Sequence, residues 1–183
     1  MCAIILDEAR LETERLVLRP PRRRDAVWIA DRINDIDIAR MTTRVPHPYT
    51  LADAEAFLES LDPADDRVFL IEHREFGPIG VLGFHQQPTV WSETGSAISP
   101  ELGYWLGRTF WGRGLATEAV QAALDWADRC WGRRAVTAGH FADNPASARV
   151  LVKAGFLYTG EVQPRFSLAR GEAAPTRMMI RLA

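Results

Sequence analysis

The stretch whose residue types most clearly suggest ligand binding is FWGRGLATEAV, residues 110–120. In it two glycines flank an arginine, and a helix-forming run follows directly. It nearly matches the nucleotide-triphosphate loop G-x-x-x-x-G-K-[ST]. Arg113 stands at the lysine position, however, and Gly114 stands where a hydroxyl would bind Mg²⁺. The dinucleotide pattern G-x-G-x-x-G fails as well, because Thr117 occupies its third glycine. Both nucleotide motifs are therefore incomplete.

The same stretch is still suited to an anion. A loop that leads from a strand into a helix presents free backbone N–H groups at the helix N-terminus. Gly112 and Gly114 let the backbone approach a ligand closely, because no Cβ stands in the way. Such a loop can hold a pyrophosphate without a metal. The alternative is a turn whose glycines merely permit positive φ, and spacing alone leaves both interpretations open.

Other side chains have the chemistry of proton transfer or of helix capping. Glu101 begins the predicted strand 101–106 and His85 ends the predicted strand 78–85, so either could serve as a general base. Each also fits a plain structural role at the end of its strand. Asn144-Pro145 has the pattern of a helix N-cap followed by proline at the first helical position.

Length and composition limit the classes of protein. The 183 residues suit one domain, residues 1–183, and the 47% hydrophobic and 25% charged content is that of a soluble globular protein. A net charge of −2 gives no general attraction to nucleic acid or to an anionic membrane. No apolar run approaches the length of a bilayer span. Cys2 and Cys130 form no disulfide framework and no metal-ligand spacing, so we expect a cytoplasmic protein without a metal.

Periodicity predicts alternating elements that position these residues. The expected strands are 15–20, 67–74, 78–85, 101–106, 133–140, 156–162 and 176–182. The expected helices are 24–33, 50–61 with Thr50 as its N-cap, 116–131 and 147–153. Helix 116–131 has the clearest apolar stripe, which includes Ala119, Val120 and Ala123. Strands followed by strand–helix–strand–helix–strand indicate a mixed α/β sheet with helices on its faces.

Several motifs together resemble one family. WGRGLATEA (111–119) resembles motif A of the GNAT superfamily of acetyl-CoA-dependent N-acetyltransferases, [Q/R]-x-x-G-x-[G/A], with Gly114 and Ala116 at the last two fixed positions. Trp111 in place of the Gln or Arg is similar to the RimJ/RimL-like branch, the ribosomal-protein-alanine N-acetyltransferase-like proteins. Four more stretches resemble that branch in its order over nearly the whole chain: LETERLVLRP (11–20), VPHPYT (45–50), LGYWL (102–106) and DNPASARVLVKAGF (143–156).

The resemblance implies a GNAT fold, an α/β (α+β) domain. Its central sheet would have about seven strands, mixed but mostly antiparallel and splayed in the middle, with helices on both faces. Acetyl-CoA would lie where strand 101–106 parts from strand 134–140. By matching position, the following groups would bind it: backbone groups of Tyr104, Trp105 and Leu106 for the pantetheine amides, backbone N–H groups of Gly112, Arg113, Gly114, Ala116 and Thr117 for the pyrophosphate, and Asn144 for the cofactor arm. The Arg113 side chain would either add charge to a phosphate or point to solvent.

The resemblance also implies direct acetyl transfer in a ternary complex, so no nucleophilic cysteine is required. Many relatives place an acidic tyrosine four residues before a G-F pair, where this chain has Leu151. In the RimJ/RimL-like branch a serine in N-x-x-S donates the proton, and Ser147 occupies that position, although a first-turn helix residue would look the same. Glu101 is the leading candidate for the base, with His85 or water as alternatives. A backbone N–H in strand 101–106 would meet the oxyanion.

The acceptor amine is expected between segment 42–61 and loop 86–100. The candidate lining residues are Arg44, His47, Tyr49, Trp91 and Glu93. The branch suggests a protein N-terminal α-amine as acceptor and is compatible with a homodimer. Polyamines, amino acids and aminoglycosides are alternatives, since a fold does not determine its substrate. A second hypothesis is a non-catalytic acyl-CoA-binding regulatory protein, which Leu151 in place of the tyrosine supports. A third is a nucleotide-triphosphate hydrolase, although its phosphate loop would lack the required lysine.

Overall fold

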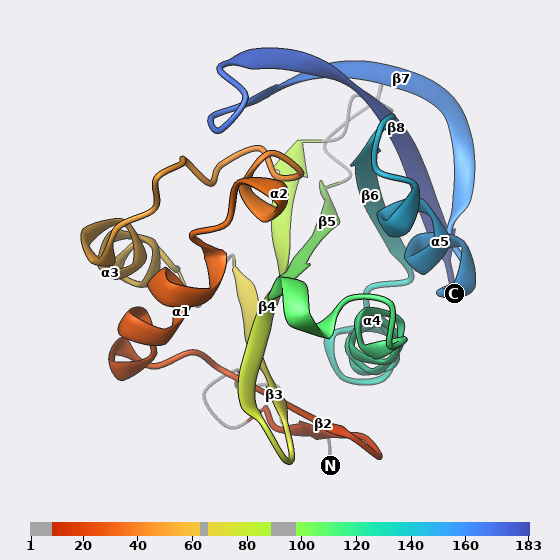
Figure 1. Cartoon of the computed structure of the whole chain (residues 1–183). Helices are drawn as coiled ribbons and strands as arrows, with labels where there is room; N and C mark the ends of the chain where they lie inside the picture. The colour runs from red at the N-terminus through yellow and green to blue at the C-terminus, as the bar shows by residue number, and fades with distance from the viewer. Residues whose placement is uncertain (1–8, 63–65, 89–97) are drawn as a thin grey trace.

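The strands of the computed structural model lie in one sheet, and the structure describes residues 9–62, 66–88 and 98–183. Within these ranges eight strands are ordered β1-β2-β3-β4-β5-β6-β8-β7 (Figure 1). Their bounds are β1 Leu11–Glu12, β2 Leu16–Arg19, β3 Arg67–His73, β4 Gly77–Pro88, β5 Ile98–Leu106, β6 Ala135–Phe141, β7 Leu157–Ser167 and β8 Glu172–Leu182. The predicted count of about seven omitted β1, which is too short for an alternating pattern to show.

Four of the five α-helices in the described ranges lie at predicted positions, whereas the short helix Ile36–Ala39 was not predicted. Their bounds are α1 Ala26–Ile33, α2 Ile36–Ala39, α3 Leu51–Glu59, α4 Leu115–Trp126 and α5 Pro145–Lys153. Thr50 caps α3 through a capping box in which its side chain and that of Asp53 each accept the other's backbone N–H, as expected for a local signal. The predicted helix 116–131 is instead α4 followed by a π-helical turn, Ala127–Trp131, which ends at Gly132 with a φ of 66°. Within the described ranges no helix combines the length and apolarity that crossing a bilayer requires.

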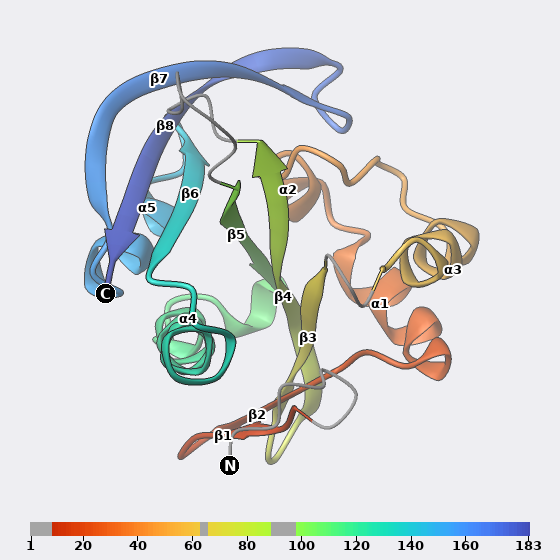
Figure 2. The same ribbon diagram turned by 180° about the vertical axis from the view of Figure 1, so that it is seen from behind.

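Helices cover both faces of the sheet, as expected. Figures 1 and 2 show α1 and α3 on one side of β3 and β4 and α4 on the other. Alternate residues of β4 serve the two layers, because successive side chains of a strand point to opposite faces. Val81 packs in the core formed with α1 and α3, whereas Leu82 and Phe84 pack in the core formed with α4.

The sheet opens between β5 and β6, which confirms the predicted splay. These strands run parallel, but they pair only through Glu101–Thr137 and Leu102–Ala138. All other neighbouring strands are antiparallel. Beyond Leu102 the backbone of β5 has no strand on its β6 side. The backbone groups that point to that side are available to a ligand, except the Leu106 carbonyl, which accepts a hydrogen bond from Trp111.

The β7–β8 hairpin arches across the end of this opening (Figure 1). Its turn reaches the segment after α2, where the N–H of Leu168 donates to the Thr43 carbonyl at 3.1 Å. Arg170, also in the turn, donates from Nε to the Arg40 carbonyl at 2.6 Å and pairs with Asp143 at 2.9 Å. The hairpin therefore ties together the two sides of the opening. Both strands extend further toward the turn than predicted. The added residues, 163–167 and 172–175, contain prolines and charged residues and show no clear strand pattern.

Candidate active site

A cavity of about 1230 Å³ fills the opening between β5 and β6 and continues over the face of the sheet that carries α1 and α3. One half is lined by β5, the glycine loop 112–117 and the start of α5. The other half is lined by the segment 41–46 and by apolar side chains of α1, α3, β3 and β4. The cavity thus joins the predicted cofactor and acceptor regions.

The glycine loop leads into an uncapped helix N-terminus. Gly114 is the N-cap residue of α4 with a φ of 78°, Gly112 has a φ of 73°, and no side chain caps the helix. The first intrahelical bond runs from the Glu118 N–H to the Gly114 carbonyl, which leaves the N–H groups of the preceding first-turn residues without a helical acceptor. Ala116 and Thr117 line the cavity at this point. Free N–H groups at the positive end of a twelve-residue helix form an anion site that opens into the cavity.

Trp111 lines the cavity but uses its indole N–H within the loop, whereas Arg113 lies outside the lining. The indole Nε1 of Trp111 donates to the Leu106 carbonyl at 2.8 Å, so this tryptophan closes the turn between β5 and α4. The Leu106 carbonyl is therefore already occupied. The Arg113 guanidinium lies 5.9 Å from the centre of the Phe110 ring and its residue is exposed, outside the cavity lining. Of the two alternatives for the Arg113 side chain, the structure has the one that faces solvent.

Polar contacts from the residues between β1 and β2 hold the glycine loop and the first turn of α4 in place, and the sequence did not indicate them. Arg15 donates from Nη1 to the Arg113 carbonyl at 3.1 Å and pairs with Glu118 of α4 at 2.6 Å. Thr13 donates to the same carboxylate at 2.6 Å. Burial alone would raise the pKa of Glu118, but the hydrogen bonds from Thr13 and Arg15 outweigh it and lower that pKa. These partners are about a hundred positions apart, so no local pattern could indicate them.

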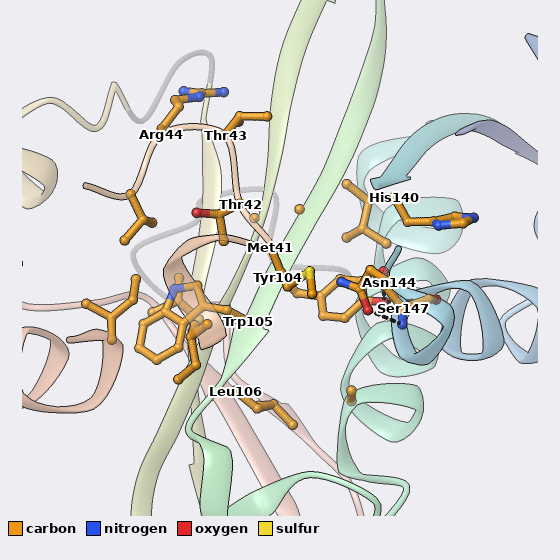
Figure 3. Close-up of a pocket in the computed structure, with 18 of the residues that line it drawn as sticks. Met41, Thr42, Thr43, Arg44, Tyr104, Trp105, Leu106, His140, Asn144 and Ser147 are labelled. Carbon is orange, nitrogen blue, oxygen red and sulfur yellow. Dashed lines mark hydrogen bonds between the residues drawn. The ribbon is translucent and has the colours of Figure 1, made fainter. Parts of the chain in front are cut away.

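Tyr104, Asn144 and Ser147 meet on the α5 side of the cavity (Figure 3). The Tyr104 hydroxyl lies 2.9 Å from Oγ of Ser147, and Oδ1 of Asn144 accepts the Ser147 N–H at 3.0 Å. Asn144 therefore caps α5, as predicted, and its amide nitrogen is left for a ligand. Burial raises the pKa of Tyr104 to about 12, although the bond to Ser147 acts in the opposite direction. The phenol accordingly keeps its proton at neutral pH.

Glu101 lies at the point where β5 leaves β6, and its carboxylate is paired. Arg165 of β7 donates two hydrogen bonds to it, one of them from Nη2 to Oε2 at 3.0 Å. Only 16% of the Glu101 side chain is exposed, so the pair is not a solvated strand end. A bidentate arginine of this kind fixes the orientation of the carboxylate. Sequence patterns gave no signal for Arg165.

His85 lies opposite Glu101, in the neighbouring strand of the antiparallel β4–β5 pair. Its Nδ1 is 2.8 Å from Oδ1 of Asp66, which directly precedes β3. Both residues line the cavity. The structure therefore brings together both base candidates named from the sequence and adds a carboxylate partner for one of them.

The predicted acceptor-site residues differ in whether they line the cavity. Arg44 and Tyr49 line the cavity, and Tyr49 is buried. His47 is exposed and outside the lining, so its prediction as a lining residue was wrong. Trp91 and Glu93 lie outside the described residues.

Cys130 offers no free thiol for a covalent route. It follows α4, packs against the main core and is disulfide-bonded, contrary to the expectation of a chain without disulfides. Among the residues in the described ranges, no three His, Cys, Asp or Glu side chains gather as a metal site would require.

Known proteins share this architecture. The profile of the acetyltransferase (GNAT) domain matches residues 15–157. An uncharacterised N-acetyltransferase of Bacillus licheniformis is 31% identical over 121 residues, which are 63% of this chain and 64% of that protein, so the match spans less than two thirds of the relative.

Two solved structures superpose on most of the chain. The ribosomal-protein-S5-alanine acetyltransferase of Vibrio fischeri has 20% identity and a TM-score of 0.78, covering 96% of this chain and 97% of that one. The spermidine N-acetyltransferase of Vibrio cholerae, in complex with CoA and spermine, has 19% identity and a TM-score of 0.75, covering 93% and 96%. At these identities the likeness shows the fold, with RimJ/RimL-like enzymes among several kinds of neighbour. The domain match over most of the chain shows the family: this chain belongs to the GNAT acetyltransferases.

Proposed function

We propose that this protein transfers the acetyl group of acetyl-CoA to a primary amine by direct attack in a ternary complex, and that the acceptor is the N-terminal α-amine of a protein. One observation carries the proposal. The uncapped N-terminus of α4 and the unpaired edge of β5 open into one cavity, which continues to a second, largely apolar half.

The donor half fits acetyl-CoA in shape and chemistry. The N–H groups of residues 112–117 would hold the pyrophosphate, and the positive φ of Gly112 and Gly114 keeps side chains out of its way. A Cβ on Gly112 would meet no atom within 4 Å, so the space above the loop is open. The pantetheine amides would pair with the backbone of β5 at Tyr104 and Trp105 and with the N–H of Leu106, whose carbonyl is occupied by Trp111. The Asn144 amide nitrogen would reach the same arm.

The Tyr104–Ser147 pair is placed for the leaving group. When the amine attacks the thioester carbon, the C–S bond breaks and a thiolate departs that must be protonated or hydrogen-bonded. Ser147, the donor expected from the resemblance, has the Tyr104 phenol beside it at 2.9 Å. We assign the pair to this role, with a backbone N–H of β5 meeting the oxyanion. Glu101, held by Arg165, would stand beside the attacking amine as a fixed negative charge.

The acceptor half favours a single cationic amine over a polycation. Each carboxylate that lines the cavity in the described residues already holds a partner: Asp37 with Arg108, Asp53 with the cap of α3, Asp66 with His85, Glu101 with Arg165, and Asp143 with Arg170. A polyamine would have to displace several of these partners. Apolar side chains such as Ile38, Val45 and Phe57 line the remaining wall, which suits the first side chains of an unfolded peptide.

An acceptor panel tests the proposal. Release of free thiol from acetyl-CoA would be followed with a peptide that has a free N-terminal alanine, its N-terminally acetylated counterpart containing lysine, spermidine, a free amino acid and an aminoglycoside. The proposal predicts fastest release with the free N-terminal peptide and background release with the blocked one. Faster thiol release with spermidine or an aminoglycoside would show that the acceptor is a small amine and not a peptide. CoA binding without thiol release for every amine would favour a regulatory protein.

A further inference from the structure

His85 is held in one orientation by a carboxylate. Its Nδ1 lies 2.8 Å from Oδ1 of Asp66, and the two side chains are only 24% and 22% exposed. An ionised carboxylate accepts hydrogen bonds only, so it selects the tautomer of a neutral imidazole that carries its proton on Nδ1. Nε2 is then an unprotonated acceptor. No hydrogen bond to Nε2 occurs within the described part of the chain.

Nε2 lies over a pair of glycines in the sheet. Gly83 of β4 pairs with Gly103 of β5, and the pair lies between His85–Glu101 on one side and Val81–Trp105 on the other. We call Gly83 and Gly103 the glycine floor. A Cβ added to Gly83 would lie 3.0 Å from Cγ2 of Val68 and 3.4 Å from Nε2 of His85, so these two side chains already cover Gly83. A Cβ added to Gly103 would meet nothing within 4 Å, so Nε2 lies over Gly83 beside the open surface at Gly103.

The glycine floor lies where the reacting thioester is expected. β5 pairs with β6 through Glu101 and Leu102, so Gly103 is the first residue of β5 on the open edge. A pantetheine chain that starts from the helix N-terminus and follows this edge ends at Gly103. The acceptor enters from the opposite half of the cavity, over the same face of the sheet. An amine nitrogen above Gly103 is thus close to both the thioester and the imidazole.

The other groups near the floor are occupied. The described charged groups that face His85 are Asp66 before β3, Glu101 on β5 and Arg165 on β7, and the last two are paired with each other. The second histidine of the cavity, His140, uses Nδ1 for the Phe141 carbonyl at 2.8 Å and has Nε2 3.1 Å from the Tyr158 hydroxyl. Among these bases only the His85 imidazole has a ring nitrogen free toward the floor.

We propose that His85 is the catalytic base for the acceptor amine and that Asp66 is its positioning residue; this inference rests on the proposed acetyl transfer. The protonated amine gives one proton to Nε2 of His85 and attacks the thioester carbon as a neutral nitrogen. The C–N bond forms and the C–S bond breaks, and the departing thiolate takes a proton from the Tyr104–Ser147 pair. The nitrogen gives one of its two remaining protons back to that pair and keeps the other as the amide hydrogen. The imidazolium then returns its proton to water, so the net products are the amide, free CoA and one proton.

The test compares pH–rate profiles with the free N-terminal alanine peptide as probe. Removal of a general base costs about 10²- to 10⁴-fold in rate. We expect His85→Asn to lose at least about 10²-fold in kcat near neutral pH and to approach the wild-type rate at alkaline pH, where the amine is already neutral. Glu101→Gln keeps the acidic limb of the profile. An equal loss for His85→Asn at every pH, or loss of the acidic limb in Glu101→Gln instead, overturns the assignment.

Controls separate this role from folding and from the proposed function. His73→Asn changes a strand-end histidine outside the cavity and leaves kcat unchanged. His85→Asn retains wild-type CoA affinity, and His85→Ala regains activity with added imidazole. Wild-type protein that binds CoA but acetylates no amine would refute the proposed function itself, and the base role with it.

A measurement that needs no catalysis tests the His85–Asp66 pair, called the dyad below. In protein labelled with ¹⁵N-histidine, NMR reports the tautomer of each ring. We expect His85 to carry its proton on Nδ1 in wild-type protein and to lose this preference in Asp66→Ala, with kcat falling while KM for the peptide stays nearly constant. Protonation on Nε2 in the wild-type protein would contradict the dyad even if the enzyme is active.

Discussion

The Tyr104 hydroxyl lies 2.9 Å from Oγ of Ser147 and links β5 to the first turn of α5 across the cavity. The sequence places Leu151 where many relatives have an acidic tyrosine, which left a regulatory protein open. In the structure Leu151 is fully buried in the core, while a phenol reaches the start of the same helix from another strand. The cavity therefore contains a protonated hydroxyl pair despite the leucine.

Removing the phenol tests the role of this pair. We expect Tyr104→Phe to lower kcat by about 10²-fold, as for loss of a general acid, and to leave the KM for acetyl-CoA nearly unchanged. Ser147→Ala retains the phenol and should lose less. Steady-state kinetics with both variants decide the matter, and a wild-type kcat in Tyr104→Phe would remove the tyrosine from the mechanism.

The Tyr104 phenol also predicts how the protein responds to alkali. Burial raises its pKa from the ordinary value of 10.0 to about 12, so the folded state favours the protonated form. The stability contributed by this group is complete below its unfolded pKa and is lost as the pH rises through the folded value. We expect the phenolate absorbance of the wild-type protein to contain a component near pH 12 that disappears in Tyr104→Phe. Tyr49, whose pKa burial also raises to about 12, should remain in that variant. A Tyr104 component near pH 10 would show that the hydroxyl is not buried in solution.

A side chain added to the glycine loop should weaken cofactor binding. Gly114 has a φ of 78° at the N-cap of α4, a conformation that β-branched residues avoid. We expect Gly114→Val to raise the Kd for CoA about tenfold or more, equal to a loss of about 1.4 kcal/mol. Isothermal titration measures it.

Gly160→Val is the matched control for the glycine loop. It imposes the same backbone strain at a φ of 86° in β7, outside the cavity. CoA affinity that falls equally in both variants would mean that strain, and not the anion site, is responsible.

Arg170 should affect the acceptor more than the cofactor. It joins the β7–β8 turn to the Arg40 carbonyl and to Asp143, which lie on opposite sides of the cavity. Without it the hairpin loses its anchor, and we expect Arg170→Ala to raise the KM for the peptide several-fold while the Kd for CoA changes little.

Arg181→Ala provides the comparison for Arg170. Its guanidinium is paired with Asp128 and is 17% exposed, against 15% for Arg170. Asp128 lies outside this cavity, whereas Asp143, the partner of Arg170, lines it. If both variants change the peptide KM alike, the effect comes from general destabilisation.

Local signals were enough to predict the frame of the site. The cap at Thr50, the glycines before α4 and the Asn144-Pro145 start of α5 each depend on neighbours within a few residues, and all three lie as expected. The contacts that orient the chemistry are different in kind. Asp66 with His85 and Arg165 with Glu101 pair across 19 and 64 positions, so only the folded sheet brings them together. A histidine or glutamate at the end of a strand looks the same in sequence whether or not the folded protein places a charged partner beside it.

The most direct test of the account is the product formed from acetyl-CoA and the peptide with a free N-terminal alanine. Mass spectrometry with fragmentation would locate the added group, and thiol release would be counted in parallel. We predict one acetyl group on the N-terminal nitrogen for each thiol released, and none on the lysine of the blocked peptide. Binding of CoA with no acetylated amine from any member of the acceptor panel would contradict the account.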